Sequence, residues 1–153
     1  MILPRYRIAP STIPGAGQGV FLDAPLRRGC IAVAPDRIDA TWTFAEILGN
    51  PEQQALLPTS VRWFEDRYTL SPDWPDECYV NHSFEPTGLW LLGFIFAMRD
   101  LHAGEELTVD YRHLLAPGQE ETFRDAHTNA AIIGYPWKDS LRLGVETLRK
   151  LIA

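Results

Sequence analysis

The sequence has few of the residues that build disulfide frameworks or metal clusters. It contains two cysteines, Cys30 and Cys78, and four histidines in 153 residues. Two cysteines are too few for a disulfide framework or a zinc cluster, and no metal-ligand spacing repeats among the histidines. We therefore expect neither a disulfide-stabilised domain nor a metal site.

Long apolar runs and blocks of basic residues are also missing. The N-terminus has no apolar stretch of signal-peptide length, and the longest apolar run, GLWLLGFIFAM, is about half the length of a membrane span. Acidic residues outnumber basic ones by 20 to 14, so the formal net charge is −6. This charge disfavours binding to nucleic acid or to an anionic membrane. We expect a cytoplasmic protein, or a nuclear one if the source is eukaryotic.

The residues that are present indicate one domain built mainly from short strands. Twelve prolines and eleven glycines cut the chain into short segments. Apolar or alternating runs between turn residues predict strands, and Thr43 followed by Glu46 predicts a capped helix. We expect strands within residues 6–11, 19–24, 30–35, 61–70, 78–80, 89–101 and 104–111, and helices at 43–50, 119–130 and from about Ser140.

The C-terminal part of the chain is predicted to be helical. Leu141, Val145, Leu148 and Ile152 recur at helical spacing, which indicates an amphipathic closing helix. We divide the chain into a core of residues 1–115, with a helical insert at about 40–75, and a C-terminal helical segment of residues 116–153.

Three stretches combine turn residues with chemically useful side chains. They are IPGAGQGVF at 13–21, YVNHSFEP at 79–86 and GEELTVDY at 104–111. Each has an ordinary interpretation when taken alone. Glycines permit positive φ and close backbone approach but often make plain turns, and a lone Asn, His or Tyr is more often a turn or core residue. The glycine spacing does not fit a dinucleotide fingerprint.

Together, in this order and spacing, the three stretches resemble the SET-domain protein lysine methyltransferases. GAGQGVF is similar to the family's G-x-G segment, YVNHSFEP to its N-H-S motif, and GEELTVDY to its E-E-L-T-x-x-Y motif. The resemblance spans residues 5 to 113. It implies a mainly β fold of several small curved sheets (the β-clip type), with a C-terminal pseudoknot and few peripheral helices. It also implies S-adenosyl-L-methionine as the cofactor and a lysine-containing protein or peptide as the substrate.

The resemblance assigns cofactor-binding roles to three parts of the chain. It implies that the backbone of Ala16, Gly17 and Gln18 contacts the methionine portion of the cofactor. Asn81 and the backbone of His82 would hold it near its adenosine and amino acid ends. Because the usual cysteine-rich segment after the domain is absent, the C-terminal residues must close the site. Trp137 is a candidate to stack on the adenine, and an equally good candidate to anchor the last helix by packing.

The reaction centre and the substrate channel follow from the same resemblance. Tyr111 would stand at the methyl-transfer centre and orient the amine together with backbone carbonyls. Trp90 would line the lysine channel, with Tyr68 as a second wall. The chain departs from the family at Phe84 and Thr87, where the motif usually has cysteine and asparagine, so the support of that loop is altered. Trp90 is bulkier than the usual aromatic residue, which favours monomethylation.

The chemistry of methyl transfer requires a neutral amine. With a pKa of about 10.4, only roughly one lysine in a few thousand is neutral at pH 7, a handicap of about 4–5 kcal/mol. Burial in an aromatic channel disfavours the ammonium, so no dedicated base is needed. A tyrosine pKa of about 10 argues against Tyr111 as a general base, and His82 is expected to support the fold.

Several alternatives stay open at this point. The departures at Thr87 and Trp90 leave room for a catalytically silent SET-like module that binds cofactor or peptide. A cysteine hydrolase using Cys78 with His82 is a weaker alternative. Acidic residues between the insert and the N-H-S motif could receive a basic peptide or form a solvated loop. A homodimer is possible, because so short a C-terminal segment leaves the cofactor partly uncovered.

Overall fold

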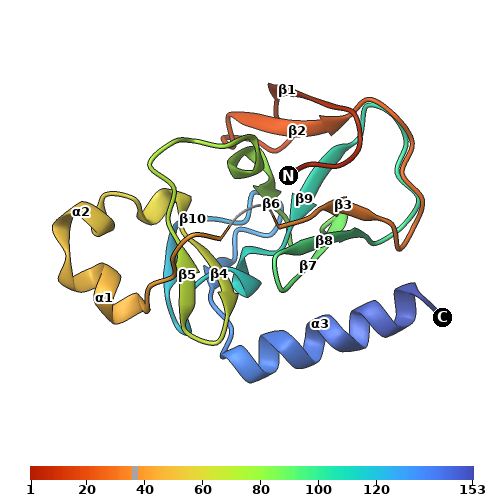
Figure 1. The fold of residues 1–153 in the computed structure, drawn as a ribbon. Helices are drawn as coiled ribbons and strands as arrows, with labels where there is room; N and C mark the ends of the chain where they lie inside the picture. The colour runs from red at the N-terminus through yellow and green to blue at the C-terminus, as the bar shows by residue number, and fades with distance from the viewer. Residues whose placement is uncertain (36–37) are drawn as a thin grey trace.

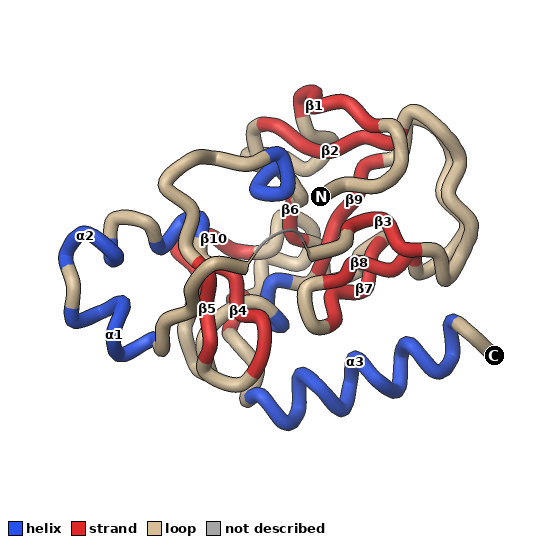
Figure 2. Tube along the Cα trace, in the orientation of Figure 1, coloured by secondary structure: helices blue, strands red, loops and turns tan. Residues whose placement is uncertain are grey.

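Small β-sheets form most of the molecule, and the helices lie at its edges (Figures 1 and 2). The structure is a computed structural model that describes residues 1–35 and 38–153. Within these ranges the strands form one four-stranded sheet, one three-stranded sheet and two two-stranded sheets. This is the mainly β architecture that the sequence predicts.

The four-stranded sheet brings the three sequence stretches together. Its strands are β1 (Tyr6–Pro10), β2 (Gln18–Leu22), β9 (Glu106–Val109) and β6 (Asn81–His82), in the order β1-β2-β9-β6. Strand β2 follows the glycine loop, β6 is the first half of the N-H-S motif, and β9 is the E-L-T-V segment. Strands β6 and β9 pair in parallel, so segments about 25 residues apart run side by side.

The three-stranded sheet packs with the first sheet around the main core. It contains β3 (Ile31–Val33), β8 (Phe94–Ala97) and β7 (Gly88–Leu91). The long apolar run is therefore a hairpin that turns at Leu92 and Gly93, both with positive φ. A Cβ on Gly93 would lie 1.7 Å from the Trp63 ring, so only glycine fits there. The main core contains Val20, Leu22, Ala32, Val33, Val80, Ile95, Ala97, Leu101, Leu107 and Val109.

The insert forms a small unit with its own apolar cluster. It consists of α1 (Phe44–Gly49), α2 (Pro51–Gln54), the 3₁₀ turn η1 (Leu57–Thr59) and the hairpin of β4 (Val61–Phe64) and β5 (Arg67–Thr69). Thr43 and Glu46 form the predicted capping box. The predicted strand at 61–70 is a hairpin, because the chain turns at Glu65, which has positive φ.

The prediction of a helix over residues 119–130 is wrong. This range instead contains strand β10 (Glu120–Arg124) and the turn that follows it. The turn leads into β11 (Ala131–Ile133), which pairs with β10 as a hairpin. The turn between the strands is held by Asp125, whose carboxylate accepts hydrogen bonds from the backbone N–H of His127 and from both the N–H and the hydroxyl of Thr128. Aspartate at such a turn competes with a helix for the same backbone N–H groups.

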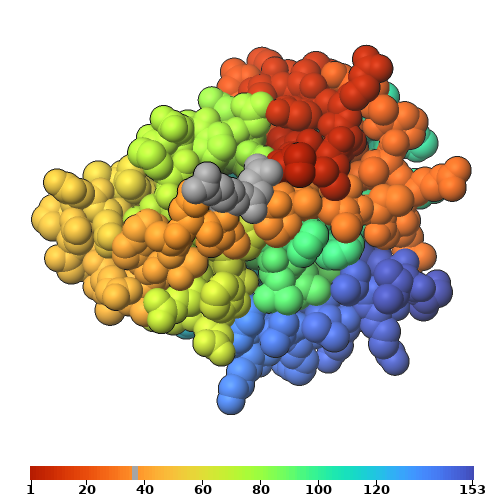
Figure 3. Space-filling model, viewed as in Figure 1, coloured from red at the N-terminus to blue at the C-terminus, as the bar shows by residue number. Residues whose placement is uncertain are grey.

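The predicted strand before Asn81 is also wrong, since those residues form the 3₁₀ turn η2 (Asp76–Tyr79). A second such turn, η3 (Tyr111–His113), follows β9. Helix α3 (Trp137–Leu151) closes the chain, and the space-filling view shows it against the residues around β7 and β8 (Figure 3). The division at about residue 115 stays a prediction.

Helix α3 packs through a different face from the one predicted. Its buried residues are Ser140, Gly144 and Leu151, whereas Val145 is 51% exposed and Ile152, just past the helix, is 70% exposed. A Cβ on Gly144 would lie 2.9 Å from Leu91 Cδ1 of β7. Small residues therefore let the helix approach the sheet, and closeness of approach outweighs hydrophobicity in choosing the buried face.

Candidate active site

The glycine loop between β1 and β2 is positioned next to Asn81. Gly15 and Gly17 have positive φ, and open space lies where a Cβ would project from each of them. The Asn81 amide donates to the Gln18 carbonyl at 2.7 Å and to Glu106 Oε1 at 3.0 Å. Both side-chain amide hydrogens are thus used inside the protein, and no described residue donates to the side-chain oxygen of Asn81, so this oxygen can accept a hydrogen bond from a ligand.

Glu106 is the buried centre of this clamp. Its carboxylate accepts hydrogen bonds from the Ser11 hydroxyl, from the N–H and hydroxyl of Thr12, and from Asn81. Burial opposes its ionisation, but these donors outweigh burial and hold the pKa of Glu106 below its ordinary value. A Cβ on Gly19 would lie 2.2 Å from Glu106 Oε1, so the carboxylate fits only beside glycine. Glu106 is therefore a buried carboxylate, whereas most glutamates are exposed to solvent.

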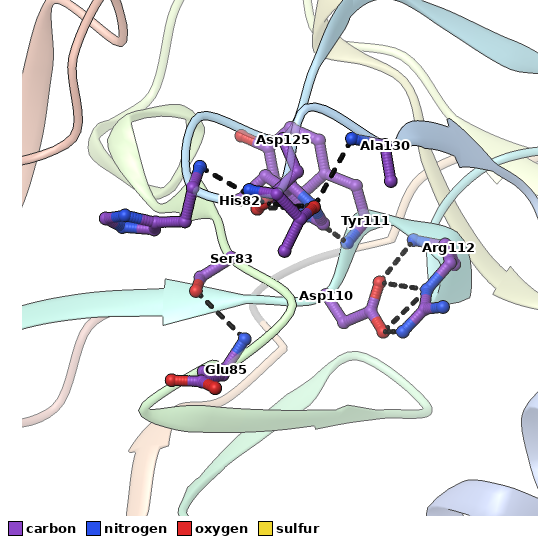
Figure 4. Close-up of polar contacts among 10 residues, drawn as sticks. His82, Ser83, Glu85, Asp110, Tyr111, Arg112, Asp125 and Ala130 are labelled. Atoms are coloured by element: carbon purple, nitrogen blue, oxygen red, sulfur yellow. Dashed lines mark hydrogen bonds and ion pairs between the residues drawn. The ribbon is translucent and has the colours of Figure 1, made fainter.

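His82 connects the N-H-S motif to Tyr111. The backbone N–H of Tyr111 donates to His82 Nδ1 at 3.1 Å (Figure 4). Nδ1 is therefore unprotonated, and the neutral ring carries its proton on Nε2. Burial lowers the pKa of His82, and Asp110 and Asp125 only partly oppose this. The neutral imidazole positions the Tyr111 backbone, in agreement with a supporting role.

The C-terminal hairpin reaches the other side of the same imidazole. Asp125 Oδ1 lies 3.7 Å from His82 Nε2, which is too long for a hydrogen bond but close enough for electrostatic attraction. Burial opposes ionisation of Asp125, but the hydroxyl and N–H of Thr128 hold its pKa below the ordinary value. The Asp125 carboxylate, from the C-terminal segment of residues 116–153, thus faces the ring that positions Tyr111. The sequence analysis did not predict this residue as part of the site.

Tyr111 directs its hydroxyl to a backbone carbonyl. The hydroxyl donates to the Val80 carbonyl at 2.9 Å, so a hydroxyl and a backbone carbonyl lie together at this position. Burial raises the pKa of Tyr111 well above its ordinary value, and Glu121 and Cys78 add to the increase. The phenol therefore stays protonated and can orient an amine but not remove its proton. Burial also raises the pKa of Cys78 to about 11, which argues against the cysteine hydrolase.

The departures at residues 84 and 87 are compensated within the loop. Thr87 exchanges hydrogen bonds with Thr108, and its hydroxyl also donates to the Glu106 carbonyl. The Phe84 ring packs edge-on against His82 and face-on against the Arg112 guanidinium, 4.3 Å from its centroid. The loop is therefore supported without the usual cysteine and asparagine.

The predicted channel residues lie in different places. Trp90 packs against Trp63, with ring centroids 5.9 Å apart, and lines a hollow of about 220 Å³ between β7, η3 and α3. Tyr68 is buried in the cluster of the insert, and its hydroxyl faces Arg62 without a well-formed hydrogen bond. Neither contacts the Tyr111 hydroxyl among the described interactions, so their channel roles stay predictions.

Trp137 is not brought to the glycine loop. It begins α3, and the Arg62 guanidinium lies 5.9 Å from its ring centroid. In Figure 1 the start of α3 and the β1–β2 loop lie at opposite sides of the molecule. This placement supports the anchoring role over adenine stacking. The aromatic residue that the C-terminal segment places near Tyr111 is Phe123 of the β10–β11 hairpin, which is 47% exposed. Its ring contacts the Tyr111 ring edge-on at a centroid distance of 6.3 Å.

A cavity of about 370 Å³ opens beside the Glu106 clamp. The described residues that line it come from the three stretches or lie next to them, apart from Arg99 and from His127 in the hairpin turn; they include Thr12, Ile13, Ser83, Glu106 and Thr108. These are neighbours of the predicted cofactor residues, not those residues themselves. Its size is within the range of small-molecule sites. The open glycine loop and the side-chain oxygen of Asn81 fit a ligand that carries an ammonium group, as the amino acid end of S-adenosylmethionine does.

The described residues form neither a metal cluster nor a membrane-spanning helix. Within residues 1–35 and 38–153, no group of His, Cys, Asp and Glu side chains is arranged to hold a metal ion. Every helix in the same ranges is too short or too polar to cross a bilayer.

Comparison with known families identifies the class of protein. Residues 17–112, more than half of the chain, match the SET domain family. The chain therefore belongs to the SET-domain family, whose members are typically protein lysine methyltransferases that use S-adenosylmethionine. No curated protein matches the chain significantly.

Proposed function

We propose that this protein transfers a methyl group from S-adenosylmethionine to the ε-amine of a lysine in another protein. One observation carries the proposal: the three stretches meet in one sheet and place the Tyr111 hydroxyl on the Val80 carbonyl, next to the Asn81 clamp. The compensated loop at Thr87 disfavours the catalytically silent alternative, because the support that the departure puts in doubt is present.

The residues of the chain act mainly by binding and orientation. The backbone around Gly17 and the carbonyl oxygen of Asn81 would hold the cofactor, which supplies a methyl group activated by its sulfonium. The Tyr111 hydroxyl and the Val80 carbonyl would align the amine with that group. Such alignment can contribute several kcal/mol to the barrier reduction. The buried surroundings of Tyr111 favour the neutral amine, and the proton leaves through water.

The test is transfer of labelled methyl groups to lysine-containing peptides, with Tyr111→Phe as the variant. Loss of a hydroxyl that acts in the transition state should lower kcat about 100-fold, while the affinity for S-adenosylmethionine changes little. Tyr135→Phe is the matched control and should keep full activity. Equal rates for wild type and Tyr111→Phe would contradict the proposal.

The background of this assay is easy to control. The chain contains only two lysines, Lys138 and Lys150, both on α3. A Lys138→Arg, Lys150→Arg double variant cannot methylate its own lysines, so label found with it must be on the peptide.

A further inference from the structure

The Asp125 carboxylate presents one of its two oxygens to the His82 ring. The N–H of His127 and the N–H and hydroxyl of Thr128 all donate to Oδ2, at 3.2, 2.7 and 2.7 Å. Oδ1 is therefore the oxygen that lies 3.7 Å from His82 Nε2. Because the hydrogen bonds of the turn fix the carboxylate, the turn also sets the direction in which Oδ1 points.

The histidine and the carboxylate are buried together. The side chains of His82 and Asp125 are 3% and 2% exposed, and Figure 4 shows them beside Tyr111. Among the described residues, Nε2 makes no hydrogen bond and no lysine or arginine forms an ion pair with Asp125. The rings of Phe84 and Tyr111 pack against the imidazole, with centroids 4.7 and 5.4 Å away. Little solvent screens the attraction between Nε2–H and Oδ1 in such a place.

The single proton of the neutral His82 ring connects Asp125 to Tyr111. Nδ1 has to be unprotonated to accept the hydrogen bond from the Tyr111 N–H at 3.1 Å. The proton then lies on Nε2 and faces Oδ1, so the carboxylate stabilises this tautomer over the other one. With the proton on Nδ1, two N–H groups would face each other and the Tyr111 N–H would lose its acceptor.

We propose that Asp125 is a positioning residue, which holds His82 in the tautomer that fixes the backbone of Tyr111 for methyl transfer. This inference rests on the proposed function, and it gives the β10–β11 hairpin a role in the reaction. Asp125 itself does not touch the reacting atoms. The direction of the Tyr111 hydroxyl follows from its backbone, and a displacement of about 1 Å at a reaction centre can cost about 100-fold in rate.

The test compares Asp125→Asn with Thr128→Ala. In Asp125→Asn the amide oxygen stays on the donors of the turn, so the NH₂ group faces Nε2 and favours a proton on Nδ1. Thr128→Ala weakens the same turn but keeps the carboxylate, which makes it the matched control. The ¹⁵N chemical shifts of the ring nitrogens report the tautomer. Wild type and Thr128→Ala should have an unprotonated Nδ1, whereas Asp125→Asn should shift toward protonation of Nδ1.

The effect on the reaction is measured with the lysine peptide that the wild type methylates fastest, at a temperature where thermal melts show every variant folded. Carboxylates that orient a histidine commonly contribute tenfold or more to activity, so Asp125→Asn should lower kcat about tenfold or more. The KM for S-adenosylmethionine should change little, because the cofactor contacts of Asn81 and the glycine loop are intact. Thr128→Ala should keep the wild-type kcat.

The outcomes separate this inference from the proposed function. An unchanged His82 tautomer in Asp125→Asn overturns the inference, as does a shifted tautomer with an unchanged kcat. An equal fall of kcat in Thr128→Ala also overturns it, because Asp125 would then act only through the turn. A wild type that neither binds S-adenosylmethionine nor methylates a peptide is evidence against the proposed function instead. The ¹⁵N shifts still decide in that case whether Asp125 sets the hydrogen bond between His82 and Tyr111.

Discussion

At the scale of single residues, Asn81 joins three segments through one side-chain amide. It holds the end of the glycine loop at Gln18 and the buried carboxylate of Glu106 on β9, and its oxygen stays available. The residue that would bind the cofactor therefore also holds the loop that would bind it. Loss of the side chain should affect stability as well as affinity.

Substitutions at Asn81 should follow a definite order of stability. Asn81→Ala should lower the free energy of unfolding by about 1–3 kcal/mol, because the buried Glu106 loses a donor. Asn81→Asp should lower it more, because it sets a second carboxylate against Glu106. Urea denaturation measures both values. An Asn81→Asp protein as stable as Asn81→Ala would show that Glu106 is not ionised in this cluster.

At the scale of elements, the β10–β11 hairpin completes the surroundings of Tyr111. Asp125 faces His82, and the Phe123 ring contacts the Tyr111 ring. This hairpin thus takes the place that the sequence assigned to a helical closing segment. Its turn depends on the hydrogen bonds that the Asp125 carboxylate accepts.

Two substitutions of Asp125 should distinguish its role as a hydrogen-bond acceptor in the turn from the effect of its charge on His82. Asp125→Ala removes the acceptor for Thr128 and should destabilise the protein by about 1–3 kcal/mol. Asp125→Asn keeps one acceptor oxygen and should lose less, while the attraction to His82 disappears. Thermal melts of both variants, with the exposed Asp139→Ala as a control, measure the difference. A larger loss for asparagine than for alanine would contradict this view of the turn.

Local signals made some elements predictable, and distant contacts decided the others. Helix α1 was predicted correctly because Thr43 and Glu46 cap it within one turn. The hairpin at 120–133 was not, because its partners His82 and Tyr111 are about 40 and 10 residues away. The buried face of α3 follows from the approach of Gly144 to Leu91, which hydrophobic periodicity does not report.

The residues of the candidate site divide in the same way, into those that local motifs predicted and those whose positions depend on distant contacts. The motifs indicated Asn81, His82 and Tyr111, which the structure brings together through β6, β9 and the His82 hydrogen bond. No motif marks Asp125 or Phe123, since their positions depend on how the hairpin folds back. The roles of Asn81, His82 and Tyr111 in binding cofactor and substrate are proposals, which binding and activity measurements test.

At the scale of the whole molecule, the buried ionisable groups make stability depend on pH. Burial lowers the pKa of His82 and His113, so both are neutral in the fold. Below their ordinary value of 6.5, the unfolded chain binds protons that the folded chain does not. Stability due to the neutral histidines is therefore present above pH 6.5 and is lost as the pH falls.

We expect the free energy of unfolding to decrease steadily from pH 7.5 to pH 5. The lowered pKa values of Glu106 and Asp125 should add a second loss below about pH 4.5, while the raised pKa of Glu121 acts in the opposite direction. Urea denaturation at half-unit steps of pH measures this curve. A His113→Asn variant should show a shallower slope between pH 6.5 and 5.5, and an identical slope would count against a buried neutral histidine.

The measurement that tests the central claim most directly is calorimetric titration of the folded protein with S-adenosylmethionine. The account predicts binding with a dissociation constant in the micromolar range, about −8 kcal/mol. Asn81→Ala, at a temperature where it is still folded, should lose this binding. Absence of binding to the folded wild type, with and without a lysine peptide, would contradict the assignment of the Asn81 and glycine-loop clamp as a cofactor site.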